Sequence, residues 1–419
     1  MPSSRRKFIA AAGASGMIGV AGCTGGDEVD EVVLGTITPL SGPFALNGTL
    51  TKQGVDFAVE EINENGGIEA LDGAEMTVVS EDTGETTDSA TSAAQDLYSN
   101  HAPSAAFGSW LSSQTLATTS VSERQGVPQL TLSYSDEIVE RGYEYTFQLA
   151  PKSSELGEQS LDLSVQLAEA VDSEIEKVAI VGDNTAAITF TFDPLRDEII
   201  PNRDGIEIVV DEVWSPTLTD ATPIVRQLQE QEPDVMIFGA TAFPDSVAIL
   251  RKMNELDVQL PMIGIGAWLA LPAYIENVGA DLAEGIMAAT GAHPLAGQEE
   301  NVRRFTEFSD EPFMIQDSLI SYAGVYVVKE AIEQSGSTDP GDVRDAISDI
   351  ELTEGNAVDS FPIDTIQFED NGHMEGAQPV LAQWKDREDA DWVGTEAAPF
   401  TVFPEEVAMR EVEWTPPEY

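Results

Sequence analysis

Few side chains in this sequence have the types and spacing that nucleophilic or metal-assisted catalysis requires. The 419 residues include one cysteine, Cys23, and three widely spaced histidines, His101, His293 and His373. The sequence contains no Gly-x-Ser-x-Gly elbow and no glycine-rich loop of the kinds that cradle phosphates. Acidic residues are so numerous, 75 in all, that a pair of them carries no specific signal. These observations favour a protein that binds a molecule without altering it, and they predict no catalytic residue, metal or cofactor.

The segment that ends at Cys23 predicts export and a lipid anchor. Arg5 and Arg6 form a basic head, and the uncharged run 8–21 that follows is too short to span a membrane, which takes about 20 apolar residues. The sequence VAGC at 20–23 resembles the lipobox of exported lipoproteins, in which the cysteine is lipidated. The sequence SRRKFI around the two arginines resembles the twin-arginine signal that exports folded proteins.

The charge balance is extreme. Against 20 Lys and Arg stand 75 Asp and Glu, a formal net charge of −55, and the acids are spread along the whole chain. Such a surface repels itself in dilute buffer, and molar salt screens that repulsion. Because 42% of the residues are hydrophobic, we expect a folded core rather than disorder. The balance indicates an extreme halophile, and it argues against nucleic acid as a partner, since no basic stripe exists.

Short apolar runs alternate with helical patterns. The segment 53–67, for example, places its apolar residues on one helical face and ends in two glycines. Strand alternating with helix predicts a doubly wound α/β architecture. Because ligands of parallel sheets bind beyond the carboxyl ends of the strands, the glycines that close the apolar runs predict a ligand-facing rim. These glycines are Gly35, Gly108, Gly182, Gly239 and Gly264.

The strand-like runs fall into two sets, which predict two lobes. One set lies within 31–149 and the other within 151–284, and each set is long enough for a small α/β lobe. A long helical pattern follows at 316–336, and two further strand-like runs follow at 364–372 and 379–386.

Five segments resemble the substrate-binding proteins of ABC importers, of the type that binds leucine, isoleucine and valine. They are PLSGPFALNG (39–48), GVDFAVEEINENGGI (54–68), FGSWLSSQT (107–115), QGVPQLTLSYSDEIVERGYEYTF (125–147) and FEDNGHMEGAQPVLAQW (368–384). The resemblance runs from about residue 31 to 390. It implies a periplasmic-binding-protein-like fold of type I, in which two doubly wound α/β lobes, joined by three crossovers, close on a ligand.

The domain organisation that follows combines this resemblance with the amino-terminal signal. We expect an export signal at 1–22, a tether at 23–30, a first lobe made of 31–149 with about 286–360, a second lobe made of 150–285 with about 361–390, and a C-terminal extension at 391–419.

The resemblance also implies ligand contacts on the first lobe. Ser112 and Ser113 match the position whose hydroxyls and amides hold an amino acid's carboxylate, and a helix that begins there would favour an anion. An ordinary N-cap serine is the alternative. The other matching or neighbouring positions are Asn47, Trp110, Ser133 and Tyr134.

The second lobe departs from the family's pattern. Ala187 and Ala242 stand where tyrosines are usual, and Gly266 stands where an acidic residue commonly pairs with the ligand's ammonium. A buried ammonium without a counter-charge costs several kcal/mol. Asp183 and Asp245 are alternative sources of that charge, although Asp245 is equally suited to cap a helix. An apolar wall for a carboxylate, amide or aromatic ligand would be built from Phe190, Phe243 and Trp268.

The function that these inferences favour is an exported, lipid-anchored receptor on the outer face of the cytoplasmic membrane. It captures a small solute and delivers it to a permease driven by an ATPase. Two alternatives remain open at this point: a sensor whose ligand-bound lobe acts on a signalling partner, and an extracellular hydrolase, which the scarcity of nucleophiles and histidines disfavours.

Overall fold

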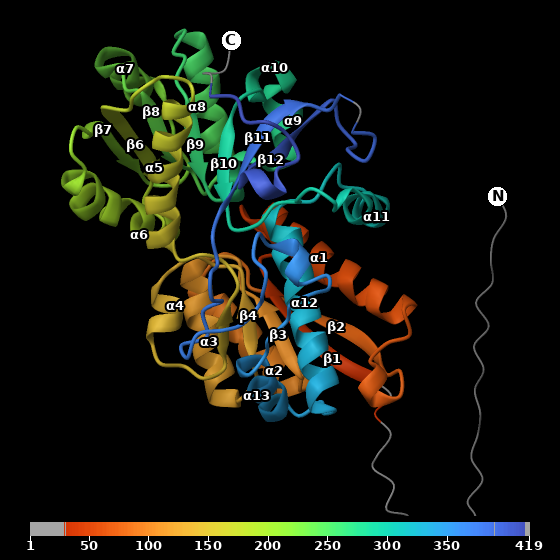
Figure 1. Ribbon diagram of the computed structural model, residues 1–419. Helices are drawn as coiled ribbons and strands as arrows, with labels where there is room; N and C mark the ends of the chain where they lie inside the picture. Colours follow the sequence, from red (N-terminus) through yellow and green to blue (C-terminus); the bar gives the residue numbers. More distant parts are fainter. Residues whose placement is uncertain (1–28, 30, 389, 415–419) are drawn as a thin grey trace, which may run out of the picture.

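The chain forms two α/β lobes, each built around its own sheet (Figure 1). The computed structural model describes residues 29, 31–388 and 390–414. This architecture is the predicted type I fold of periplasmic binding proteins. Within the described residues, no helix is long and apolar enough to cross a membrane.

The first lobe has a five-stranded parallel sheet in the order β2-β1-β3-β4-β5. Its strands are β1 (Glu31–Thr38), β2 (Glu75–Asp82), β3 (Ala105–Gly108), β4 (Gln129–Thr131) and β5 (Thr146–Gln148). Its helices are α1 (Ala45–Glu64), α2 (Thr87–His101), α3 (Ser112–Gln125), α4 (Glu137–Glu140), α12 (Gln316–Ser335) and α13 (Pro340–Ser348).

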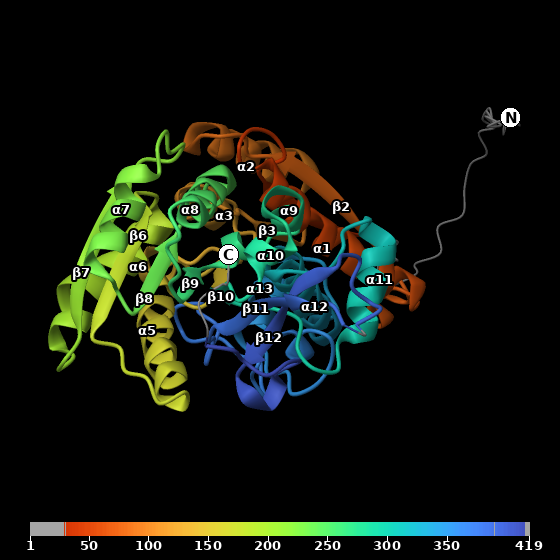
Figure 2. The ribbon, with the colours of Figure 1, turned by 90° about the horizontal axis from the view of Figure 1, so that it is seen from above.

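The second lobe has a seven-stranded sheet in the order β12-β11-β10-β9-β8-β6-β7, so that β7 and β12 form its opposite edges (Figure 2). The strands are β6 (Lys177–Asp183), β7 (Glu207–Trp214), β8 (Val235–Gly239), β9 (Met262–Ile265), β10 (Met287–Thr290), β11 (Val380–Asp386) and β12 (Ala397–Phe403). The helices are α5 (Ser153–Ala170), α6 (Ala186–Pro194), α7 (Thr222–Gln231), α8 (Phe243–Glu255), α9 (Ala273–Val278) and α10 (Ala280–Ala283).

Three crossovers connect the lobes. The first links β5 to α5, and the second runs from β10 to α11 (Glu299–Ser309), which packs on α1. The third precedes β11, because Met374 still donates its backbone N–H to Gln148 at the edge of the first sheet. Single helical turns complete the chain at Glu69–Leu71, Leu195–Ile199, Ile200–Asn202, Ala267–Leu269, Val358–Ser360 and Glu405–Val407.

The packing of α1 against α12 shows how sequence pattern becomes structure. Val55, Ala58 and Ile62 of α1 are buried, as their helical spacing predicts. A Cβ at Gly54 would lie 2.1 Å from the carbonyl oxygen of Ser318, so only glycine allows the two helices to approach this closely. The contact fixes α12, and therefore its amino end, against the first lobe.

Two details at the C-terminal side differ from the sequence expectations. The run 364–372 forms no strand. It makes isolated bridges only, at Ile366 and Phe368. The range 391–419, expected to be an extension, contains β12, which pairs antiparallel with β11 and completes the second sheet.

Candidate functional site

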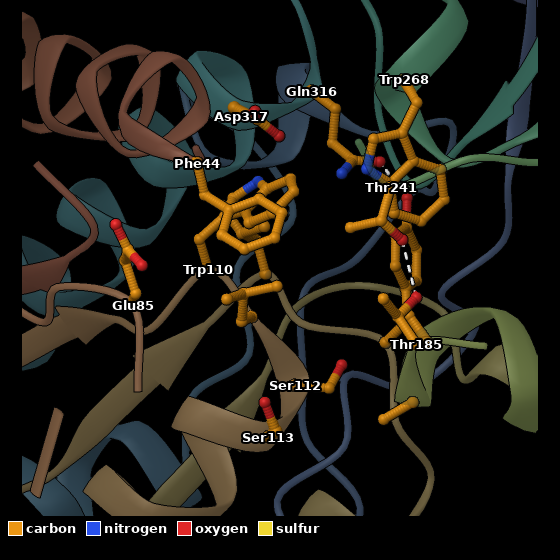
Figure 3. A pocket seen from close by; sticks show the side chains of 15 residues that line it. Phe44, Glu85, Trp110, Ser112, Ser113, Thr185, Thr241, Trp268, Gln316 and Asp317 are labelled. Atoms are coloured by element: carbon orange, nitrogen blue, oxygen red, sulfur yellow. Dashed lines mark hydrogen bonds between the residues drawn. The ribbon is translucent and has the colours of Figure 1, made fainter. Parts of the chain in front are cut away.

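A pocket of about 230 Å³ lies between the two lobes. The first lobe supplies side chains at the amino ends of α3 and α12, and the second lobe supplies side chains at the amino end of α6 and beyond β8 (Figure 3). The predicted residues that line it are Trp110, Ser112, Ser113, Tyr134, Ala187 and Trp268. The site is thus a cleft site in which both lobes reach the same small volume.

The amino end of α3 forms the floor of the pocket. Its N-cap is Leu111, not a serine, and no side chain caps the first amides of the helix. Ser112 is buried and accepts a hydrogen bond from the backbone N–H of Ser135 at 3.4 Å, whereas Ser113 is exposed. The uncapped amides and the positive end of the helix dipole favour a negatively charged group at this place.

Aromatic rings flank the space above this floor. The rings of Phe44 and Trp110 lie 5.7 Å apart, tilted by 32°, on the first lobe. Figure 3 shows Trp268 on the opposite side, from the second lobe. The indole N–H of Trp268 is buried and has no hydrogen-bond partner among the described residues, so it is a donor that a bound molecule would satisfy.

Asp317, at the second position of α12, is the buried acid of the pocket. It is 1% exposed, and its Oδ2 accepts a hydrogen bond from Asn47 Nδ2 at 3.0 Å. Burial raises the pKa of Asp317 to about 6, although Asn47, Trp110 and Gln316 favour the ionised form. Asn47 is therefore a neighbour of the acid rather than a pocket-lining residue.

The pocket is directly connected to the second crossover. The hydroxyl of Tyr134 donates to Oε1 of Gln316. The same Oε1 accepts hydrogen bonds from the Thr290 hydroxyl at 2.6 Å and from the Gly291 backbone N–H at 2.7 Å. Tyr134 and Gln316 thus contact both the ligand space and the segment where the chain passes between lobes.

The wall of the second lobe is organised by Asp183, which does not itself line the pocket. Its carboxylate accepts hydrogen bonds from the backbone N–H and hydroxyl of Thr185 at 3.0 and 2.6 Å. It also accepts the backbone N–H of Thr241. Burial raises the pKa of Asp183, and these hydrogen bonds oppose that shift. The second lobe thus lines the pocket here with small, uncharged side chains, those of Thr185, Ala187 and Thr241.

Several other predicted site residues lie away from the pocket lining. Ser133 is buried, and its hydroxyl is within 3.0 Å of the carbonyl oxygens of Ser109 and Trp110. Asp245 accepts hydrogen bonds from the Trp214 indole and from the backbone of the following loop. The remaining three are Phe190, which is 36% exposed, Ala242, which is the N-cap of α8, and Phe243, which packs edge-on against Tyr274.

Gly266 cannot be replaced by the expected acid without a clash. Its φ is +80°, and a Cβ there would lie 2.4 Å from Cζ3 of Trp268. The indole therefore takes the space in which an acidic side chain would approach the ligand.

The predicted glycine rim is wrong. None of the five glycines lines the pocket. A Cβ at Gly35 would lie 2.5 Å from Leu97 of α2, and a Cβ at Gly239 would lie 2.6 Å from Ile188 of α6. Glycine at these two strand positions makes room for the covering helices, not for a ligand.

Residues 31–389 match the periplasmic binding protein family. The chain belongs to this family. A Leu/Ile/Val-binding protein homolog of Brucella melitensis is 25% identical over 397 residues, which cover 91% of this chain and 93% of that protein. Membership of this family places the chain among the extracytoplasmic solute-binding proteins.

Solved structures share its fold. The branched-chain amino acid transporter substrate binding protein LivJ of Streptococcus pneumoniae, in complex with isoleucine, has a TM-score of 0.70 and 20% identity, covering 88% of this chain and 99% of that one. A solute binding protein of an ABC transporter from Rhodopseudomonas palustris, in complex with 3,4-dihydroxybenzoic acid, has a TM-score of 0.72 and 18% identity, covering 92% and 99%.

Sequence reasoning missed several residues that line the binding protein's pocket: Phe44, Glu85, Leu111, Leu132, Thr185, Ala186, Thr241, Gln316 and Asp317. A signal existed for the last two. They are the polar pair that opens the long helical pattern at 316–336, directly after the apolar run PFMI. No sequence rule, however, places the start of that helix at the same pocket as the start of α3.

In the described part of the chain, no group of three His, Cys, Asp or Glu residues is arranged to hold a metal ion. Arg5, Arg6 and Cys23, on which the export and lipidation predictions depend, lie outside the described residues.

Proposed function

We propose that this binding protein captures a small carboxylate-bearing solute in the cleft and delivers it to an ABC permease. The observation that carries the proposal is the pocket itself, whose lining comes from both lobes and includes the uncapped start of α3. Branched-chain amino acids and related carboxylates or amides are the solute class, since relatives of the same fold bind isoleucine and a benzoic acid.

Ser112 and the first amides of α3 hold the carboxylate in this proposal. The described residues that line the pocket include no lysine, arginine or histidine, so backbone amides and hydroxyls are the groups available for an anion. Such donors, at a helix start, are the ordinary means of binding a carboxylate without a basic side chain.

Lobe closure is the step that commits the solute. A ligand that contacts Ser112 on one lobe and Thr185 or Trp268 on the other stabilises the closed arrangement, because only that arrangement offers both sets of contacts. The hydrogen bonds that the Gly291 backbone N–H in the crossover donates to Tyr134 and Gln316 link occupancy of the pocket to the position of the lobes. The permease then reads the closed form.

The amino-terminal features complete the proposal. Export through the twin-arginine signal at Arg5 and Arg6, followed by lipidation of Cys23, would hold the protein on the outer face of the cytoplasmic membrane beside its permease. The excess of acidic residues suits a halophilic source, whose high salt screens their repulsion.

Equilibrium titration of the purified protein in molar KCl tests the function. The panel holds leucine, isoleucine, valine, their amides and short carboxylates. A bound member should raise the melting temperature and change tryptophan fluorescence, because Trp110 and Trp268 line the pocket. The variant Trp214→Phe controls for fluorescence changes elsewhere, since Trp214 does not line it. Failure of every member to bind would reject solute capture of this class.

A further inference from the structure

We propose that Asp317 receives the protonated amino group of the solute, so that the site takes a zwitterionic amino acid whose two charged groups are both held by the first lobe. This inference rests on the proposed function and adds the position of the counter-charge. In the family's usual arrangement an acid on the second lobe has this role, and here Gly266 stands at that position.

The Asp317 carboxylate is buried, and one of its two oxygens lacks a hydrogen-bond donor among the described residues. The side chain lines the pocket and is 1% exposed. Oδ2 is satisfied by Asn47, but Oδ1 is buried without a hydrogen-bond partner. The side chains of Trp110 and Gln316 lie close enough to favour the ionised carboxylate, but no donor of the described residues meets hydrogen-bond geometry at Oδ1. A buried carboxylate oxygen without a donor is costly, and an ammonium in the pocket would satisfy it.

Asp183 and Asp245, the other two candidates for the counter-charge, already accept hydrogen bonds from the protein. Asp183 accepts hydrogen bonds from Thr185 and Thr241 and holds the second-lobe wall together. Both oxygens of Asp245 accept hydrogen bonds, from the indole of Trp214 and from the following loop. These carboxylates are occupied, and neither lines the pocket.

The surroundings of Asp317 also suit a cation. Figure 3 shows its carboxylate facing the rings of Phe44 and Trp110, and the face of an aromatic ring attracts an ammonium. Glu85 is the other acid among the described lining residues, and it is exposed, so water already solvates its charge. No basic side chain lines the pocket to compete for Asp317.

The carboxylate and ammonium positions lie on the same lobe. The start of α3 offers donors to an anion, and the start of α12 offers the Asp317 carboxylate to a cation. A solute that bridges these two positions carries both charges, and its side chain then points toward Trp268 and the alanines of α6. This combination selects amino acids over simple acids or simple amines.

Matched pairs of probes test the inference. Leucine and 4-methylpentanoate differ only in the amino group, as do phenylalanine and 3-phenylpropanoate. Calorimetric titration in molar KCl should show at least one amino acid binding about tenfold or more tightly than its deaminated partner, the effect of one hydrogen bond to a charged group. The variant Asp317→Asn, which keeps an oxygen for Asn47, should abolish this preference. Glu330→Gln removes the same charge from the C-terminal part of α12, away from the pocket lining, and should keep the preference.

The outcomes separate this inference from the function on which it rests. Equal binding within every pair, or a preference that survives in Asp317→Asn, overturns the inference and leaves solute capture intact. Loss of the preference in Glu85→Gln but not in Asp317→Asn assigns the counter-charge to Glu85 and also overturns it. If no probe binds the unmodified protein, both the function and the inference fail. The comparison of probe pairs in the unmodified protein needs no variant to fold.

Discussion

The indole of Trp268 lies directly over the α-carbon of Gly266, so close that a Cβ on the glycine would be 2.4 Å from Cζ3 of the ring. The two positions are coupled, because the ring can occupy this place only while residue 266 has no side chain. The pocket therefore has a tryptophan wall where the family resemblance led us to expect an acid.

Restoring that acid by Gly266→Glu should destabilise the protein. The new side chain overpacks against Trp268, which costs about 1–3 kcal/mol, and the backbone φ of +80° adds strain for any residue with a Cβ. Thermal melting in molar KCl measures the loss. The double variant Gly266→Glu with Trp268→Ala removes the clash, and a melting temperature no higher than that of Gly266→Glu alone would contradict the steric explanation.

Trp268→Phe should weaken solute binding with little effect on folding. The indole N–H has no hydrogen-bond partner within the described part of the chain, so its removal costs a hydrogen bond made with the solute, about 0.5–1.5 kcal/mol. Titration and melting of the same samples give both quantities. Trp214→Phe is the matched control: its N–H donates to Asp245 at 2.9 Å, and its loss should lower the melting temperature and leave affinity unchanged.

Ser112→Ala should reduce the affinity for a carboxylate solute by about 1–3 kcal/mol, because it removes a hydrogen bond to a charged group. Ser113→Ala, one position further along α3, should have a smaller effect, since Ser113 is exposed and water competes for its hydroxyl. Both affinities come from titration with the tightest member of the panel. Equal affinities in Ser112→Ala and the unmodified protein would exclude this contact.

Much of the fold was predictable from local patterns. Apolar runs at Val178, Val235 and Met262 are strands, because a buried parallel strand needs a continuous apolar run. The run 364–372 resembled a strand but makes isolated bridges only, while β12 was hidden in a stretch that reads as an extension. Pairing partners decide such cases, and a single sequence does not reveal them.

The candidate site was predictable only where a residue's own type carried the signal. Ser112, Trp110 and Trp268 are distinctive and do line the pocket. Asp317 was missed because the sequence holds 74 other acidic residues, and only its burial at the pocket lining distinguishes it from them. Burial of one acid among many is a tertiary property.

Stability should rise steeply with salt. The net charge of −55 repels itself over a Debye length of about 10 Å at 0.1 M salt, and this length falls to about 3 Å at 1 M. Melting should therefore shift upward between these salt concentrations, by about 2–4 °C for each kcal/mol of repulsion that is screened. Matched melts in KCl and in sucrose separate charge screening from general stabilisation. Equal melting temperatures at both salt concentrations would remove the argument for a halophilic source.

The ionisation of Asp317 predicts a pH dependence of the ligand-free protein. Burial raises its pKa from an ordinary 3.8 to about 6, so the folded state binds a proton more tightly than the unfolded state. The stability contributed by the protonated form is present below about pH 4 and is lost as the pH rises to about 6, a difference of about 3 kcal/mol. Other groups also titrate, and the pKa of buried His293, lowered to about 3, acts in the opposite direction.

Comparison with Asp317→Asn isolates this contribution, because every other titrating group is common to both proteins. The unfolding free energy of the unmodified protein, minus that of the variant, should fall between about pH 4 and pH 6 and stay constant at higher pH. Denaturant unfolding across this range measures the difference. A bound amino acid whose ammonium lies against Asp317 should lower the pKa of Asp317. The difference in unfolding free energy between the two proteins should then fall less as the pH rises. If this difference in unfolding free energy did not change with pH, burial would not raise the pKa of Asp317.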